Sequence, residues 1–265
     1  MSSPLFTQAV REVGDWIRSE RREFKANAVE TKAFNSLVSY VDQQAELMLI
    51  DRLTAALPGS GVLGEEGGGT WIAGGSNWII DPLDGTTNFI HDLPPYAVSV
   101  ALMRGRDLVW AAVYELGQGR MFSAELGGGS FCDGRRLSIR EGAPLSSGLV
   151  ATGFPYHDFS QMAQYLKALQ ACFRAARGIR RFGSAATDLA WLADGRFQGF
   201  FEQGLAPWDV AAGILLVREA GGTVSDFFGS DLDDYDLVRS RSITAGNPSA
   251  YRDLVSLTTD SFLPS

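Results

Sequence analysis

The chain has 265 residues, of which 45% are hydrophobic and 20% charged, which is typical of a globular protein with a large apolar core. Its formal net charge of −8, from 23 basic and 31 acidic residues, argues against nucleic acid or an anionic membrane as the primary partner. No segment approaches the roughly 20 apolar residues of a transmembrane helix, and the first residues lack the pattern of a signal peptide. We therefore expect a cytoplasmic protein.

The first sixty residues predict two amphipathic helices. The apolar positions of the first helix repeat at helical spacing and are Leu5, Phe6, Ala9, Val10, Val13, Trp16 and Ile17. Those of the second are Val41, Ala45, Met48, Leu49, Leu53 and Ala56, before a stop at Pro58 and Gly59. We expect both helices to turn these faces inward.

The middle of the chain predicts β-strands joined by short turns. Runs of apolar, β-branched or aromatic residues lie at 78–80, 96–103, 107–115 and 119–125. Asp133 and Gly134 form a typical hairpin turn before Leu137 and Ile139. Because the connections are short, neighbouring strands are expected to be antiparallel.

The second half of the chain alternates between predicted strands and helices. The strands lie at 147–152, 178–182, 197–202, 223–227 and 242–246. The helices lie at 158–175, at 184–194, near Trp208 and at the C-terminus. Antiparallel strands followed by this alternation predict an α/β (α+β) fold, a layered sandwich with two sheets. We treat residues 1–265 as one domain, with an α+β half at about 1–145 and an α/β half at about 146–265.

The most informative segment is WIIDPLDGTTNF, at residues 78–89. A predicted buried strand stops at Asp81, Pro82 prevents further ladder pairing, and Asp84 adds a second carboxylate. Two acids three residues apart repel each other unless a cation lies between them, and Mg²⁺ prefers oxygen ligands. The alternative is an Asp-rich turn in which an aspartate caps the next helix.

Other acidic residues lie where predicted elements begin or end. Glu65 and Glu66 follow a short apolar pair, Asp209 lies in the first turn of a helix, and Asp42 lies near the start of the second helix. Capping would explain Asp42 and Asp209, and solvation would explain Glu66. Taken together with Asp81 and its neighbours, acids at four element boundaries fit a carboxylate cage for more than one cation.

Gly85 and Thr86 predict a tight turn or a helix N-terminus directly after Asp84. Exposed backbone N–H groups at such a position bind anions. A phosphate held there would also contact a metal bound by Asp81 and Asp84. Thr86 could instead be a plain N-cap, and the two roles use the same geometry.

These motifs resemble the inositol monophosphatase family of Mg²⁺-dependent, lithium-sensitive phosphatases. The resemblance rests on DPLDGTTNF, with GEE before it and PWDVAAG after it. Similar blocks cover residues from about 30 to 247, and they are YAVSVALM, LGGGSFCDGRRL, ATGFPY, RFGSAATDLAWLADG, FEQGLAPWDVAAG and REAGGTVSDF. The resemblance implies an α-β-α-β-α layered sandwich that forms a homodimer.

The resemblance also implies which residues bind two or three Mg²⁺ ions. Glu65 is implied to bind one ion and to help position the attacking water, and Asp81 is implied to bridge two ions. The carbonyl of Leu83 is implied to be a further ligand, and Asp84 and Asp209 to hold the second ion.

The remaining implied roles concern water and substrate. Thr86 is implied to hydrogen-bond the attacking water and to pair with Asp42, while the amides of Gly85 and Thr86 hold the phosphate. The residues implied to bind substrate are Asp84, Gly85, Thr86, Gly183, Ser184, Ala185, Glu202 and Asp209, of which Gly183, Ser184, Ala185 and Glu202 match positions that line the sugar or polyol pocket. The chain departs from the family pattern at Ser39, where Thr is usual, and in a short glycine-rich loop at 67–77. The resemblance therefore does not decide whether this loop closes over the site or whether a third metal site exists.

We expect the chain to hydrolyse the phosphate monoester of a small polyol by metal-activated water, with myo-inositol 1-phosphate as the leading substrate. DGTTNF is similar to the inositol phosphatase branch. The alternatives are phosphatases for histidinol phosphate, fructose 1,6-bisphosphate or 3′(2′),5′-bisphosphate nucleotides, and a regulatory interaction protein of the same family. Neither a membrane, nucleic acid nor the transcription machinery is expected as the primary partner.

Several residues are interpreted as supporting the fold or the pocket entrance. We expect Cys132 and Cys172 to be packed, reduced thiols, because two cysteines give neither a disulfide framework nor a thiolate metal site. His91 is interpreted as a packing residue or one behind the metal ligands, and His157 as a loop residue near the substrate entrance. The run at 67–69 is interpreted as a hinge that carries Trp71 and Ile72 over the site.

Overall fold

The computed structural model describes residues 3–23, 29–33, 36–139, 142–156 and 158–263. Its helices are α1 (Ser3–Glu23), α2 (Tyr40–Ala56), α3 (Thr86–Ile90), α4 (Met162–Ala175), α5 (Ala185–Ala193), α6 (Pro207–Glu219), α7 (Asp234–Leu237) and α8 (Pro248–Phe262). Its strands are β1 (Val29–Ala33), β2 (Ser36–Ser39), β3 (Gly61–Gly64), β4 (Ser76–Asp84), β5 (Ala97–Arg104), β6 (Asp107–Glu115), β7 (Arg120–Glu125), β8 (Gly129–Cys132), β9 (Arg135–Arg136), β10 (Leu149–Thr152), β11 (Gly178–Arg180), β12 (Gly199–Gln203), β13 (Thr223–Ser225) and β14 (Ser242–Gly246).

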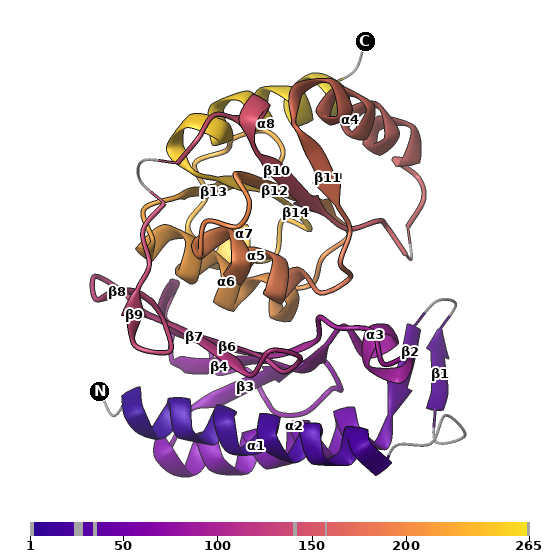
Figure 1. The fold of residues 1–265 in the computed structure, drawn as a ribbon. Coiled ribbons are helices and arrows are strands. Elements are labelled where there is room, and N and C mark those ends of the chain that lie inside the picture. The colour runs from indigo at the N-terminus through magenta and orange to yellow at the C-terminus, as the bar shows by residue number, and fades with distance from the viewer. Residues whose placement is uncertain (1–2, 24–28, 34–35, 140–141, 157, 264–265) are drawn as a thin grey trace.

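The elements stack in alternating layers (Figure 1). Helices α1 and α2 cover the outer face of a seven-stranded sheet, and α5 and α6 lie between this sheet and a five-stranded one. Helices α4 and α8 cover the far face of the five-stranded sheet. The predicted α-β-α-β-α sandwich is confirmed.

The seven-stranded sheet runs in chain order from β3 to β9. Its strands from β4 onward are antiparallel to their neighbours, as predicted from the short connections. Strands β3 and β4 are parallel, and the sequence did not predict this pair. Asp133 and Gly134 form the predicted turn between β8 and β9, with φ of 49° and 79°, which matches a turn that needs two positive φ angles.

The five-stranded sheet has the order β11-β10-β12-β14-β13. Strand β10 is parallel to β11 and β12, and β14 is antiparallel to β12 and β13. The predicted alternation of strands and helices in this half is confirmed. Its strands lie within residues 149–246, so the predicted boundary between the two halves of the chain, at about residue 145, falls between the two sheets. The division into domains stays a prediction.

The helices bury their apolar residues against the neighbouring layers. Helix α1 buries Phe6, Val10, Val13 and Ile17 completely or nearly so, whereas Leu5 in its first turn is 54% exposed. Helix α6 is apolar around most of its circumference, because a sheet or another helix contacts every side of it. Within the described residues, no helix combines the length and the apolar composition that crossing a bilayer requires.

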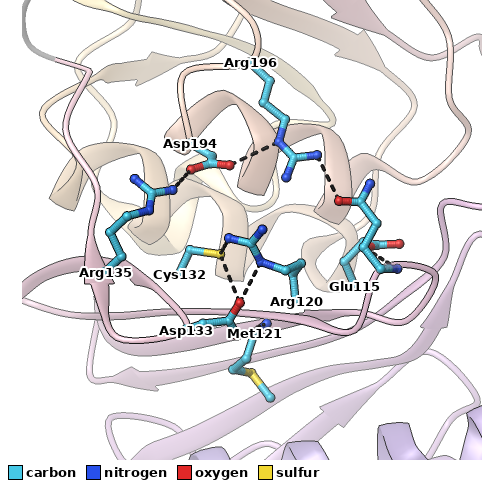
Figure 2. Close-up of polar contacts among 9 residues, drawn as sticks. Glu115, Arg120, Met121, Cys132, Asp133, Arg135, Asp194 and Arg196 are labelled. Atoms are coloured by element: carbon cyan, nitrogen blue, oxygen red, sulfur yellow. Dashed lines mark hydrogen bonds and ion pairs between the residues drawn. The ribbon is translucent and has the colours of Figure 1, made fainter.

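A polar cluster joins the end of α5 to the edge of the seven-stranded sheet. Figure 2 shows Asp194 between Arg135 of β9 and Arg196, and it forms an ion pair with each. Nearby, Arg120 of β7 donates a hydrogen bond to Cys132 and pairs with Asp133. Cys132 is buried and reduced, and so is Cys172. The prediction of packed thiols is confirmed.

Candidate active site

The DPLDGT segment forms the end of strand β4 and the turn into α3. The strand does not stop at Asp81, as we predicted, but continues to Asp84 through a bulge. Pro82 and Leu83 of β4 lie opposite Val98 alone on β5, because Pro82 cannot donate to the ladder. The backbone N–H of Leu83 donates to Asp81 Oδ1 over 2.9 Å. The bulge thus re-aims this end of the strand.

The parallel register of β3 and β4 brings Glu65 to the same sheet edge as Asp81. Gly64 pairs with Ile80, so the next residues on each strand, Glu65 and Asp81, are adjacent. The N–H of Glu65 donates to the carbonyl of Ile80 over 3.2 Å. Burial, followed by the charge of Glu65, raises the pKa of Asp81, because the two carboxyl groups lie close together. The sequence placed Asp81 at a strand end and Glu65 after a short apolar pair, and the structure makes them neighbours.

Asp42 and Thr86 meet although 44 positions separate them. Ser39 is the N-cap of α2, and Asp42 at the third helical position closes a capping box by accepting from the Ser39 backbone N–H over 2.9 Å. The other oxygen of Asp42 accepts a hydrogen bond of 2.8 Å from Thr86 Oγ1. Thr86 is not an N-cap, because Gly85, with φ of 91°, occupies that position of α3. Asp42 therefore closes the capping box of one helix and holds Thr86 at the pocket.

Asp84 lies at the N-terminus of α5, a helix from the other half of the chain. Its Oδ2 atom accepts from Ser184 Oγ and from the backbone N–H of Ala186, each over 2.7 Å. Ser184 is also the N-cap of α5. These bonds use one oxygen of the Asp84 carboxylate. The positive end of the α5 dipole favours the ionised form of this carboxylate.

Asp209 occupies the first turn of α6, as the sequence predicted. Its Oδ2 atom accepts from the backbone N–H of Ala206 over 2.7 Å, so it does act in capping. The capping interpretation and a functional one are compatible, because the capping bond uses only one of its two oxygens.

Most of these residues line one pocket of about 410 Å³. From the predicted site, its lining comprises Glu65, Asp84, Gly85, Thr86, Gly183, Ser184, Ala185, Glu202 and Asp209. Asp42, Asp81 and Leu83 do not line it and are buried, with 2%, 1% and 1% exposure. The structure therefore brings the predicted residues together, with nine on the pocket wall and three behind it.

Three acids of the pocket wall and Asp81 behind it have raised pKa values. Burial, followed by the charges of Glu65, Asp84 and Asp209, raises the pKa of Asp81 well above its usual range. Burial likewise raises the pKa of Asp84 to about 6, although its hydrogen bond from Ser184 opposes the shift. Burial and then the charge of Asp84 raise the pKa of Asp209 well above its usual range and that of Glu202 to about 8. These carboxylates repel one another.

No lysine or arginine of the described residues forms an ion pair with Asp81, Asp84 or Asp209. Across the same part of the chain, no three His, Cys, Asp or Glu side chains already have the arrangement of a metal site. The donor set consists of carboxylate and carbonyl oxygens, which suit Mg²⁺. The site therefore has the chemistry of a hard-cation site, and its ligands would have to draw together around the ion.

Several residues of the pocket wall were not predicted from the sequence. Arg181 lies there with its guanidinium 5.6 Å from the ring centre of Phe154 and 5.2 Å from that of Tyr156. Asn88 donates to the carbonyls of Pro95 and Phe182 over 2.8 and 2.7 Å, which joins α3 to the other half. An arginine two residues before the GSA motif was the available signal.

Two interpretations of nearby residues are wrong. Trp71 does not line the pocket, because its ring packs against Tyr235 and Arg239 on another part of the molecule. His91 is exposed at the end of α3, so it is not a packing residue. His157 lies outside the described residues.

Comparison with known proteins gives one consistent result. The profile of the inositol monophosphatase family matches residues 3–261. An inositol-1-monophosphatase of Rhizobium meliloti is 41% identical over 246 residues, covering 92% of this chain and 90% of its own. The Nus factor SuhB of Escherichia coli is 40% identical over 248 residues, covering 92% of this chain and 90% of its own.

The fold is also that of a solved relative. The crystal structure of the extragenic suppressor protein SuhB from Bartonella henselae superposes with a TM-score of 0.87 at 36% identity, covering 96% of this chain and 97% of its own. The family is generally metal-dependent. Geometry, sequence and fold agree: the chain belongs to the inositol monophosphatase family and is a phosphatase.

Proposed function

We propose that this phosphatase hydrolyses the phosphate monoester of a small polyol, with myo-inositol 1-phosphate as the leading substrate. One observation carries the proposal: Glu65, Asp84, Asp209 and Glu202, from four separate segments, line a single pocket beside the turn at Gly85. The pocket volume of about 410 Å³ suits a small ligand. The name of the Rhizobium relative supports inositol monophosphate as the substrate.

The proposed cofactor is Mg²⁺, with two or three ions. Glu65, Asp81, Asp84 and Asp209 would hold it together with the carbonyl of Leu83. The mutual repulsion of the four acids supports this assignment, because a bound cation would relieve it. When bound, Mg²⁺ supplies the positive charge that activates water and stabilises the phosphoryl and leaving oxygens.

Thr86 and Asp42 form the proposed water-positioning pair. The hydroxyl of Thr86 donates to Asp42, so its oxygen lone pairs are available to accept a hydrogen bond from water. Asp42 is fixed in turn by two hydrogen bonds from Ser39. The backbone N–H of Ser39 donates to it, and so does the Ser39 hydroxyl, over 2.6 Å. Thr86 would therefore orient the attacking water at the pocket wall, with Glu65 assisting.

The substrate would lie between the α3 turn and α5. The amides of Gly85 and Thr86 are the proposed phosphate donors, and Asp84 and Asp209 face the same space. Gly183, Ser184, Ala185 and Glu202 are proposed to contact the polyol. Glu202 accepts hydrogen bonds from hydroxyl groups when it is ionised, which suits a ligand rich in hydroxyls.

The substrate assignment can be tested with purified protein and Mg²⁺. Phosphate release would be measured from myo-inositol 1-phosphate, histidinol phosphate, fructose 1,6-bisphosphate and a 3′(2′),5′-bisphosphate nucleotide. We expect the highest kcat/KM for myo-inositol 1-phosphate. A clear preference for another of the four would overturn the substrate assignment and leave the phosphatase chemistry in place.

A second candidate function is regulatory. It is favoured by the several relatives at about 40% identity that carry the name Nus factor SuhB. Such a role would be an interaction with the transcription machinery alongside hydrolysis. Pull-down with RNA polymerase and its factors, comparing the native protein with Asp84→Asn, would separate the two functions. Binding that survives the loss of hydrolysis would establish independent roles, and absence of binding by both proteins would remove the second.

A cytoplasmic location stays a prediction from the sequence. Two further parts of the proposal, homodimer formation and lithium inhibition, are carried over from the family resemblance. Sedimentation velocity at micromolar concentration would show a dimer if the first is correct. Titration of LiCl against KCl in the phosphatase assay would show selective inhibition by lithium if the second is correct.

A further inference from the structure

Glu46 is a buried acid of α2 that holds the loop between β3 and β4. Its side chain is 3% exposed. Its Oε2 atom accepts from the backbone N–H of Glu66 over 2.9 Å, and its Oε1 atom accepts from that of Gly68 over 2.8 Å. Both oxygens of one carboxylate therefore bind the loop that starts with Glu65.

The hydrogen bond to Glu66 completes the anchoring of Glu65. On its N-terminal side, the N–H of Glu65 donates to the carbonyl of Ile80 on β4. On its C-terminal side, the next N–H, that of Glu66, donates to Glu46. Both peptide groups that flank Glu65 are thus fixed, one by the sheet and the other by α2. The direction of the Glu65 side chain is set by these two anchors.

The glycines of this loop make room for Glu46. A Cβ atom on Gly64 would lie 2.2 Å from Oε2 of Glu46, and one on Gly68 would lie 2.4 Å from Oε1. Gly67 and Gly69 have φ of 90°, which side-chain-bearing residues rarely adopt. The glycine-rich run therefore fits the loop closely around a buried carboxylate, which is the opposite of the hinge that we expected from the sequence.

We propose that Glu46 is the positioning residue of the active site, which fixes the loop so that Glu65 faces the cations. This inference rests on the proposed function, in which Glu65 is a metal ligand. Groups that orient a ligand from behind typically change metal affinity by about 10- to 100-fold when they are removed. Glu46 acts through the backbone and does not line the pocket.

Glu115 provides a matched control within the same chain. It is 0% exposed, and its two oxygens accept from the backbone N–H groups of Gly117 and Gln118, each over 2.9 Å. The loop that it holds joins β6 to β7 and does not line the pocket. Glu115 and Glu46 therefore share burial and hydrogen-bond chemistry, and they differ in which loop they hold.

The test compares Glu46→Gln with Glu115→Gln. Glutamine keeps one acceptor oxygen but turns an NH₂ group toward the second backbone N–H, so one loop anchor is lost in each variant. Three quantities would be measured: hydrogen exchange of residues 61–70 in metal-free protein, Mn²⁺ affinity by calorimetry, and the Mg²⁺ dependence of hydrolysis. The first two do not require activity.

We expect Glu46→Gln to accelerate exchange at Glu66 and Gly68, to weaken Mn²⁺ binding by about tenfold or more, and to raise the Mg²⁺ requirement accordingly. Glu115→Gln should leave the exchange of residues 61–70 unchanged and Mn²⁺ affinity within about twofold of the native value, because it loosens a different loop. Equal Mn²⁺ affinity in the native protein and Glu46→Gln, or an equal loss in both variants, would overturn the inference.

Gly68→Ala is a second variant in case Glu46→Gln does not fold. It keeps the charge of Glu46 and displaces its carboxylate with one methyl group, so Mn²⁺ affinity should fall in the same direction. The outcomes also separate this inference from the proposed function. If the native protein neither binds Mn²⁺ nor hydrolyses phosphate esters with Mg²⁺, the proposed function fails. If it does both and Glu46→Gln and Gly68→Ala match it, only the role of Glu46 fails.

Discussion

Two groups of acids in this molecule differ in what neutralises them. At the end of α5, Asp194 lies between Arg135 and Arg196, and Asp133 pairs with Arg120 (Figure 2). In the pocket, Asp84 accepts from a hydroxyl and a backbone N–H, and Asp209 accepts from a backbone N–H, instead of from arginine. The first group has arginine partners within the chain, whereas Asp81, Asp84 and Asp209 form no ion pair with a lysine or arginine of the described residues, and a bound cation would supply that positive charge. This difference fits a structural role for the first group and the proposed cation-binding role for the second.

The pKa values of the pocket acids support the same conclusion. Asp81 and Asp209 have pKa values raised by burial and by their acidic neighbours. A protein retains such repulsion only where something offsets it, because each unit of pKa shift represents about 1.4 kcal/mol. Strained electrostatics of this kind are typical of functional sites.

Asp209→Asn is expected to have the largest effect. It should lower kcat by about 100-fold or more, because it removes a proposed metal ligand. Asparagine can still accept from the Ala206 N–H, so the fold and Tm should be nearly unchanged. Steady-state phosphate release and thermal unfolding would be measured together. Activity near the native level would show that Asp209 is not a ligand.

Mg²⁺ should stabilise the native protein in a pH-dependent way. The raised pKa values mean that the cation displaces protons, so its affinity should rise as pH increases through about 6, the pKa of Asp84. At about 100 times Kd, binding adds about 2.7 kcal/mol, which corresponds to several degrees in Tm. Thermal unfolding with Mg²⁺ or EDTA at about pH 5 and pH 8 tests the sign. A larger Mg²⁺ effect at the lower pH would contradict it.

Glu202→Gln should flatten the pH dependence of stability in metal-free protein. The folded pKa of about 8 lies above the ordinary value of 4.5, so its stabilising contribution is present below pH 4.5 and is lost as pH rises toward 8. The unfolding free energy of the native protein should therefore fall across this window, and that of Glu202→Gln should fall less. Urea unfolding in EDTA at several pH values measures both, and identical slopes would show that Glu202 does not titrate in this way.

Asp194→Asn should have the smallest effect, and it should change stability but not activity. It weakens contacts to Arg135 and Arg196, so we expect a loss of about 1 kcal/mol in unfolding free energy. Activity and Mg²⁺ dependence should be unchanged. A change in Mg²⁺ dependence as large as that of Asp209→Asn would remove the distinction between the two groups of acids.

Periodicity and turn chemistry were sufficient for most of the fold. The predicted strands 107–115 and 242–246 match β6 and β14 residue for residue. Strand β3 was not predicted, because four residues carry too little pattern and its pairing with β4 depends on long-range register. The extension of β4 past Pro82 was missed for a related reason, since a bulge is fixed by the partner strand.

The predicted site residues did converge, but the sequence could not show how. Asp42 and Asp209 were explained equally well as caps, and the structure shows that capping uses one oxygen of each. Arg181 was missed although it begins the RFGSAATDLAWLADG block, because the block does not show that its side chain reaches the pocket, and Glu46 lies in none of the quoted motifs. Glu46 in particular is recognisable only once the loop that it holds is folded against it.

The most direct test of the account is anomalous diffraction from a crystal soaked in Mn²⁺. We predict at least two Mn²⁺ peaks in the space bounded by Glu65, Asp81, Asp84 and Asp209, with the carboxylates drawn toward them. Absence of anomalous density there, in crystals of protein that is active with Mn²⁺ in solution, would contradict the central claim that these acids form a cation cage.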